Sequence, residues 1–379
     1  TEVQTTRVDG NFNWTLVRVY SDAGVAGTGE AYWGSGVTDL VEEAASRIVG
    51  ENPCDIDRLY TEMVRGLSAQ GSIGGAAVTA ISGIEMALHD LAGKLLGVPA
   101  YQLLGGKYRD EVRVYVDCHA GAHSTEDTAG AYSPEAYADA AAAVAAEGYD
   151  ALKFDLDTRE ESDEYSRHLS PDDIAYMESL VAATTERVEA DVAFDCHWNY
   201  SGDSARRLAA AVEEYDVWWL EDPIPPENHD VQREVTRGTT TTICAGENLY
   251  RDHGVRQLIE EQGVDIIQPD MPRVGGMGET VRIAEMADTY YLPMALHNVS
   301  TPLGTVAGAH VAAASPNFLA IEYHSRELDW WADVVEEDVM TEGRLDVPDE
   351  PGLGVTLDRE VVAANLLDGE TLFDPAPEA

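Results

Sequence analysis

The 379-residue sequence predicts an α/β protein in which a (β/α)8 TIM-like barrel follows a smaller α+β region. From about residue 112, short apolar runs alternate with helical stretches, as expected for repeated βα units. Three of these runs end in a carboxylate, at positions 195, 221 and 247, so that one carboxylate follows another by 26 residues. The alternative is an open doubly wound sheet. The chain, however, has no GxGxxG turn after its first predicted strand, where such a fold would carry one.

The N-terminal region reads as a strand pair followed by helices. Residues 14–20 and 25–32 are rich in strand-forming residues, and a turn at 21–24 joins them. Helical patterns are expected at 38–49, 54–66 and 74–96. Because this part shows no βα repeat, we expect it to form a domain of its own, over residues 1–111.

The barrel is expected over residues 112–345. Its predicted strands are 112–117, 150–155, 191–196, 217–221, 241–246, 264–269, 291–296 and 318–322, with intervening helices such as 134–147, 171–187 and 203–214. The segment 346–379 contains Pro348, Pro351, Gly352 and Gly354 and is expected to return to the N-terminal domain as irregular structure.

The composition narrows the class of partner. The net charge is −46, and the only lysines are Lys94, Lys107 and Lys153, so the chain would repel nucleic acid and anionic membranes. No apolar run reaches membrane-spanning length and no signal peptide is visible, so we expect a cytoplasmic protein. So acidic a surface is expected to be adapted to multimolar salt, where screening removes self-repulsion.

The four cysteines, Cys54, Cys118, Cys196 and Cys244, show no CxxC spacing. Cys196 and Cys244 lie in apolar strand runs. We therefore expect buried free thiols there rather than disulfides or zinc ligands.

Asp195, Glu221 and Glu247 are the candidate metal ligands. Each closes an apolar run, and a carboxylate at the end of a buried strand is costly unless a charged partner meets it. With 70 acidic residues in the chain, solvated charge is the competing explanation. Most of the other acids lie in polar stretches, however, so the spacing favours one hard cation held at the end of the barrel.

Other strand ends carry further ionisable groups that would converge on the same pocket. Lys153, inside an apolar run, is expected to face a substrate carboxylate, and Asp155 is either a second substrate contact or the partner of that lysine. His197 would point the same way as Asp195 if its strand continues.

The last strands add a candidate base. His297 ends the seventh strand and Asp270 the sixth, and a carboxylate that fixes an imidazole tautomer suits a general base. Glu322, at the eighth strand, is expected to stay protonated beside other carboxylates and to donate a hydrogen bond.

With these motifs the sequence resembles the enolase superfamily, in its mandelate racemase-like branch. The matching stretches are Leu152-Lys153-Phe154-Asp155, Phe194-Asp195-Cys196-His197, Leu220-Glu221-Asp222-Pro223, Ala245-Gly246-Glu247-Asn248, Gln268-Pro269-Asp270, Val274-Gly275-Gly276, residues 297–304 and the interdomain junction at 84–106. The resemblance implies that the N-terminal domain caps the barrel and that the subunits form a homo-oligomer. It also implies one Mg²⁺ per subunit on Asp195, Glu221 and Glu247, and removal of a proton α to a carboxylate.

Two departures select among the family's reactions. Where racemases and lactonising members carry Lys-x-Lys, this chain has Asp155 in place of the second lysine, and His197 follows the first ligand as in galactonate-type sugar-acid dehydratases. By that resemblance the substrate is a small sugar acid. His297, paired with Asp270, would take the C2 proton, and His197 would protonate the leaving 3-hydroxyl. The resemblance leaves open which of the two histidines has which role. Lys153, His197, His297, Asp155 and Glu322 would contact the substrate.

Two alternatives stay open. The first is a racemase or epimerase of a 2-hydroxy acid that uses Lys153 and His297 as opposed bases. The second is a catalytically silent protein whose acids serve salt adaptation. Substrate choice is expected to depend on capping loops at 32–34 and 69–71 and on the loop following His119.

Overall fold

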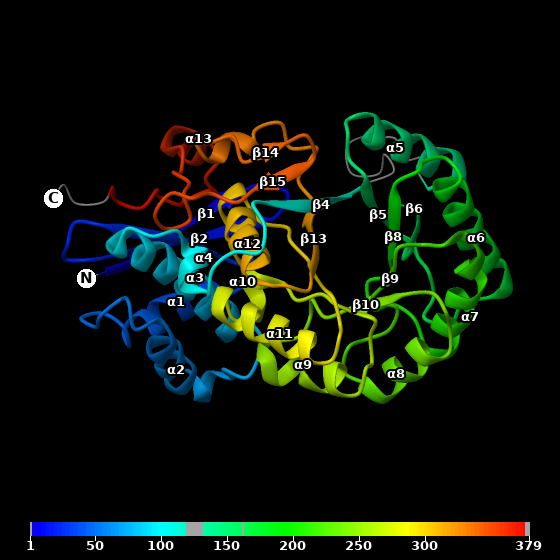
Figure 1. Cartoon of the computed structure of the whole chain (residues 1–379), viewed down its shortest axis with the longest axis horizontal. Coiled ribbons are helices and arrows are strands. Elements are labelled where there is room, and N and C mark those ends of the chain that lie inside the picture. Colours follow the sequence, from blue (N-terminus) through cyan, green and yellow to red (C-terminus); the bar gives the residue numbers. More distant parts are fainter. Residues whose placement is uncertain (1, 119–131, 161–162, 376–379) are drawn as a thin grey trace.

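The computed structural model describes residues 2–118, 132–160 and 163–375 and consists of a barrel with a smaller domain against one side (Figure 1). The loop following His119 lies outside the described residues. Both ends of the chain lie at the side occupied by the smaller domain (Figure 1).

The smaller domain pairs a three-stranded antiparallel sheet with helices. The sheet order is β1-β2-β3. Its elements are β1 (Glu2–Asp9), β2 (Asn13–Tyr20), β3 (Ala26–Ala31), α1 (Val37–Ala45), α2 (Ile56–Gly66), η1 (Ser68–Gln70), α3 (Ala76–Leu96) and α4 (Ala100–Leu103). The predicted strands and helices are thus present. The sequence did not predict β1, because this edge strand is mostly polar and only two of its residues are buried.

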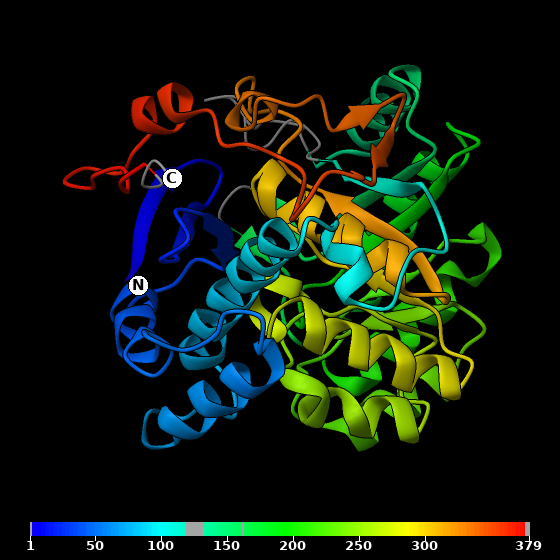
Figure 2. The same cartoon turned by 60° about the vertical axis from the view of Figure 1, so that its left-hand side comes forward.

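Helix α3 is the element that joins the sheet to the barrel. It contacts β3 and also two barrel helices, α10 (Met271–Val274) and α11 (Met277–Thr289). Figure 2 turns this side of the molecule forward. Gly29 makes the close approach to β3 possible, because a Cβ there would lie 2.4 Å from the carbonyl oxygen of Gly83. The helix is therefore buried along nearly its whole length.

Eight parallel strands form the closed barrel. Neighbouring strands pair in the order β4-β5-β8-β9-β10-β11-β12-β13, and β13 pairs with β4. The strands are β4 (Glu111–Asp117), β5 (Ala151–Asp155), β8 (Asp191–Asp195), β9 (Leu220–Glu221), β10 (Ile243–Ala245), β11 (Ile266–Ile267), β12 (Met294–Leu296) and β13 (Phe318–Tyr323). This closure confirms the predicted barrel and excludes the open doubly wound sheet.

The barrel helices lie outside the strands (Figure 1). They are α5 (Pro134–Ala146), α6 (Pro171–Thr185), α7 (Gly202–Val212), α8 (His229–Arg237), α9 (Arg251–Glu260), α10 (Met271–Val274), α11 (Met277–Thr289) and α12 (Pro302–Ala314), with η2 (Glu213–Tyr215) after α7 and the hairpin β6 (Thr158–Glu160) and β7 (Asp163–Glu164) before α6. Inside the barrel, large rings alternate with small side chains, since Tyr115 and Trp219 pack beside Ala151 and Ala193.

After the last strand the chain returns to the smaller domain. It passes through η3 (Ala332–Val334), β14 (Met340–Thr341), β15 (Arg344–Asp346) and α13 (Arg359–Ala364). β15 pairs antiparallel with β4. Farther on, Leu366 bridges to Val8 of β1, and Glu370 lies 2.6 Å from the guanidinium of Arg7.

Buried carboxylates connect the smaller domain to the start of two barrel helices. Glu30 of β3 accepts a hydrogen bond from the backbone N–H of Thr301, the N-cap of α12, at 3.1 Å. Glu85 of α3 accepts from the N–H groups of Met277 and Gly278 at the start of α11, at 2.7 and 2.9 Å. Since helix N-termini carry partial positive charge and unpaired donors, these contacts hold the two domains together.

The cysteines are all free thiols, and Cys118, Cys196 and Cys244 are buried, which confirms the expectation for the last two. Among the described residues, no helix is long and apolar enough to cross a membrane.

Candidate active site

The carboxyl ends of the barrel strands bring the predicted polar residues together. β5 supplies Lys153, β8 ends at Asp195, β9 at Glu221, and Glu247 follows β10. A parallel barrel presents all these ends at one face, so residues far apart in sequence become neighbours. Lys153, Asp195, Glu221 and Glu247 are at most 3% exposed, which excludes the explanation that these acids are solvated surface charge.

Asp195, Glu221 and Glu247 form a compact group of oxygen donors. One carboxylate oxygen from each lies within 4.8 Å of the others. Burial raises the pKa of Glu221 well above its usual value and also raises that of Glu247. At Asp195, by contrast, His197 and Lys153 outweigh burial and hold the pKa below its usual range. Three buried carboxylates around one point fit a hard divalent cation, which would neutralise them together.

Two buried donors orient Glu221. Trp219 Nε1 and Gln268 Nε2 each donate to its Oε2 at 2.8 Å, and Tyr115 in turn accepts from Gln268 at 2.9 Å. Such supporting hydrogen bonds fix the direction in which a ligand oxygen points. Sequence reasoning missed both supports: Gln268 meets Glu221 only in the folded barrel, whereas Trp219, two residues before Glu221, could have been found from the alternation of side chains along a strand.

Lys153 lies at the centre of the carboxylates. Its Nζ is 2.8 Å from Glu322 Oε1, 2.9 Å from Glu221 Oε1 and 3.2 Å from Asp195 Oδ2. Although burial acts to lower it, the three carboxylates raise the pKa of Lys153 well above its usual value. The ammonium is therefore held in its charged form. The Asp155 carboxylate faces His197, at 3.8 Å from its Nδ1, and the ion pairs of Lys153 are with Asp195, Glu221 and Glu322.

His297 and Asp270 form the expected pair. His297 Nδ1 lies 2.6 Å from Asp270 Oδ2, and the two residues also share a backbone bridge between neighbouring strand ends. Nε2 faces the carboxylate cluster, 3.3 Å from Glu247 Oε2. Burial opposes the charged ring, yet Glu247, Glu322 and Asp270 together raise the pKa of His297 to about 10. The carboxylate on Nδ1 leaves Nε2 as the nitrogen directed into the site.

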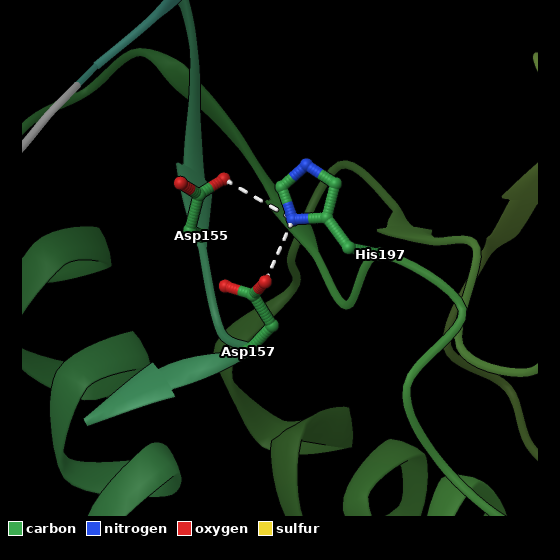
Figure 3. A group of neighbouring side chains, drawn as sticks. All are labelled: Asp155, Asp157 and His197. Carbon is green, nitrogen blue, oxygen red and sulfur yellow. Dashed lines mark ion pairs between the residues drawn. The ribbon is translucent and has the colours of Figure 1, made fainter. Parts of the chain in front are cut away.

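His197 reaches the site by another route than a continued strand. β8 ends at Asp195, and His197 and Trp198 both adopt left-handed backbone conformations, with φ of 42° and 58°. Nε2 of His197 nevertheless lies 3.5 Å from Asp195 Oδ2. Its Nδ1 lies 3.1 Å from Asp157 Oδ2 and 3.8 Å from Asp155 Oδ1 (Figure 3). Asp157 was missed in the sequence, because it follows the strand in a turn rather than ending it.

Three donors approach the Glu322 carboxylate: the backbone N–H of Asn298, the hydroxyl of Tyr115 at 3.5 Å and the ammonium of Lys153. Oε2 receives a hydrogen bond from the backbone N–H of Asn298 at 2.9 Å, and Oε1 faces Lys153. The donor role expected from the sequence stays a prediction.

A cleft of about 550 Å³ opens beside His197, which suits a small polar molecule. The loops after β8, β9 and β10 line it with Trp198, Asn199, Pro225 and Asn248 among others. From the capping side, the ring of Tyr32 comes within 6.4 Å of the His297 ring, centroid to centroid. The capping loop at 32–34 therefore reaches the candidate base.

Comparison with known proteins agrees with this geometry. Residues 4–105 match the mandelate racemase/muconate lactonizing enzyme N-terminal domain, and residues 135–361 match the enolase C-terminal domain-like family. The chain belongs to the mandelate racemase/muconate lactonizing branch of the enolase superfamily. A family member of known structure, a mandelate racemase/muconate lactonizing enzyme-like protein from Rubrobacter xylanophilus, superposes with a TM-score of 0.92 at 39% identity, over 99% of both chains.

Similar family members are named as dehydratases. The D-xylonate dehydratase of Haloferax volcanii is 60% identical over 99% of this chain and 90% of its own length. The D-galactonate dehydratase of Ralstonia nicotianae is 30% identical over 92% of this chain and 90% of its own. The chain is thus an enzyme of this superfamily, and the catalytically silent alternative is set aside.

Proposed function

We propose that the protein is a Mg²⁺-dependent sugar-acid dehydratase that acts on an aldonate of the D-xylonate type. The observation that carries the proposal is the placement of two histidines around one carboxylate cluster. Nε2 of His297 lies 3.3 Å from Glu247 and Nε2 of His197 lies 3.5 Å from Asp195. The 60% identical relative is named as a D-xylonate dehydratase, which supports both the reaction class and the substrate type.

Asp195, Glu221 and Glu247 would hold the metal. When bound there, Mg²⁺ would neutralise Glu247, whose charge raises the pKa of His297, and would stabilise negative charge on the substrate carboxylate. Lys153 would add a fixed positive charge beside the same carboxylate.

The two histidines divide the proton transfers. His297 takes the C2 proton through Nε2, while Asp270 holds Nδ1. The electron pair left at C2 forms the C2–C3 double bond as the 3-hydroxyl leaves with a proton from His197. The resulting enol ketonises, so that one sugar acid yields one 2-keto-3-deoxy acid and one water.

The racemase alternative is less well supported. It leaves His197 without a part in the reaction, although the ring of this residue lies 3.5 Å from Asp195, and the 60% identical relative is named as a dehydratase.

The test is turnover of an aldonate and aldarate panel with Mg²⁺ in multimolar KCl, read by a 2-keto acid assay. We expect a five-carbon aldonate to be dehydrated and the His297→Asn variant to be inactive. Absence of turnover across the panel, or exchange of the C2 proton for deuterium without loss of water, would contradict the dehydratase.

A further inference from the structure

The side chain of Asp157 faces the ring nitrogen of His197 that points away from the carboxylate cluster. Nδ1 lies 3.1 Å from Asp157 Oδ2 (Figure 3). Nε2, by contrast, lies 3.5 Å from Asp195 Oδ2. Asp155 stands farther from Nδ1, at 3.8 Å. The imidazole ring of His197 therefore lies between the Asp157 carboxylate and the carboxylate cluster of the candidate active site.

The segment that carries His197 is held in a strained backbone conformation. Two consecutive non-glycine residues, His197 and Trp198, have positive φ, a backbone conformation that L-amino acids adopt only at a cost in free energy. Trp198 is fixed by its contacts with Asp222, to which it donates from the indole Nε1 at 2.9 Å and from the backbone N–H at 2.7 Å. Strain that the surroundings maintain is typical of a residue whose direction matters to function.

The segment that carries Asp157 is tied to the same loop. Leu156 N–H donates to Asp195 O at 2.6 Å, and Tyr200 donates from its hydroxyl to Leu156 O. On the other side, Tyr165 N–H donates to Asp157 O at 2.9 Å, and Asn199 Nδ2 donates to Tyr165 O at 3.1 Å. The Asp157 carboxylate and the His197 imidazole are thus carried by two backbone segments that are hydrogen-bonded to each other.

We propose that Asp157 is a positioning residue for His197: it holds Nδ1 so that Nε2 is directed at the substrate 3-hydroxyl. This proposal rests on the proposed function, in which His197 is the acid that protonates the leaving hydroxyl. Asp270 is hydrogen-bonded to Nδ1 of His297 at 2.6 Å, and Asp157 faces Nδ1 of His197 at ion-pair distance, so each of the two histidines has a carboxylate beside Nδ1. A carboxylate that orients a catalytic imidazole in this way acts through the histidine and does not touch the substrate.

The first test compares two reactions of the full-length enzyme. Dehydration requires a proton for the leaving hydroxyl, whereas a 3-deoxy-3-fluoro aldonate releases fluoride without one. We expect Asp157→Ala to lower kcat for dehydration by roughly 10- to 100-fold and kcat for fluoride release by less than about threefold. Asp157→Asn, whose amide oxygen can still accept from Nδ1, should recover part of the loss. The matched control, Asp203→Ala, changes an exposed aspartate at the start of α7 and should alter neither rate.

Equal loss in both reactions would overturn the proposal, because it would indicate general damage to the site. Unchanged dehydration in Asp157→Ala would overturn it as well. A second measurement does not depend on turnover: ¹⁵N NMR of histidine-labelled enzyme, with His197 assigned by its loss in His197→Gln. We expect the His197 ring signals to shift in Asp157→Ala and those of His297 to stay in place. Unshifted His197 signals would refute the positioning role, whereas a wild-type enzyme that dehydrates no sugar acid would refute the proposed function instead.

Discussion

Glu30 offers a direct test of how the capping domain is bound to the barrel. Its carboxylate is 2% exposed and accepts from Thr301 at the start of α12. Burial raises the pKa of Glu30 from 4.5 to about 7, even though the Thr301 contacts act in the opposite direction. Because the pKa is higher in the folded than in the unfolded state, ionisation costs folding free energy. The stabilisation is complete below about pH 4.5 and is lost as the pH rises through about 7.

The magnitude follows from the pKa. A rise from 4.5 to about 7 corresponds to about 3 kcal/mol of unfolding free energy. Glu30→Gln removes this titration and keeps the shape. Part of this stabilisation is already lost at pH 5, so relative to wild type we expect the unfolding free energy of the variant to gain about 2.5 kcal/mol between about pH 5 and about pH 8.

The assay is urea unfolding of both proteins at the two pH values in multimolar KCl. Comparing variant with wild type at each pH cancels the contribution of all other titrating groups. Glu42→Gln, on the exposed face of α1, is the matched control and should show no such change. The reasoning would be refuted if the difference in unfolding free energy between wild type and Glu30→Gln were the same at both pH values, within about 0.5 kcal/mol.

Three further predictions concern the site and the surface. Glu221→Gln should weaken Mg²⁺ binding by at least about tenfold, measured by calorimetry, and unchanged affinity would remove Glu221 from the ligand set. Lys153→Met leaves three buried carboxylates without their ammonium partner, so we expect the unfolding free energy to fall by about 3–5 kcal/mol in urea unfolding. A variant as stable as wild type would show that those carboxylates are protonated. Because the net charge is −46, the melting temperature should rise as KCl is added, and a fall would contradict salt adaptation.

The barrel strands and the residues at their ends were predictable because both follow local rules. An apolar run marks each buried strand, and the residue that closes it lies at the face where all the strand ends meet. Asp195, Glu221, Asp270 and His297 could be placed in this way. The edge strand β1 could not, since it buries too few residues to leave an apolar pattern.

The residues missed from the site act through contacts that only the folded chain creates. Gln268 meets Glu221 from a different strand end, and Asp157 meets His197 because two loops turn toward each other. His197 was assigned to the site through a continued strand, whereas it arrives there through a left-handed turn. The structure places His197 beside the carboxylate cluster, but its left-handed backbone conformation could not be predicted from an apolar run.

The attachment of Glu30 and Glu85 to the starts of α12 and α11 limits how such enzymes can be recombined. Helix α12 starts directly after the loop that follows His297. Thr301, which donates to Glu30, therefore belongs to the same segment as the proposed base His297. A capping domain transferred from a relative would bring its own substrate loops but would need matching donors at both helix starts. We expect chimeras to fold and turn over only when the segments at 276–278 and 298–304 are transferred with the cap.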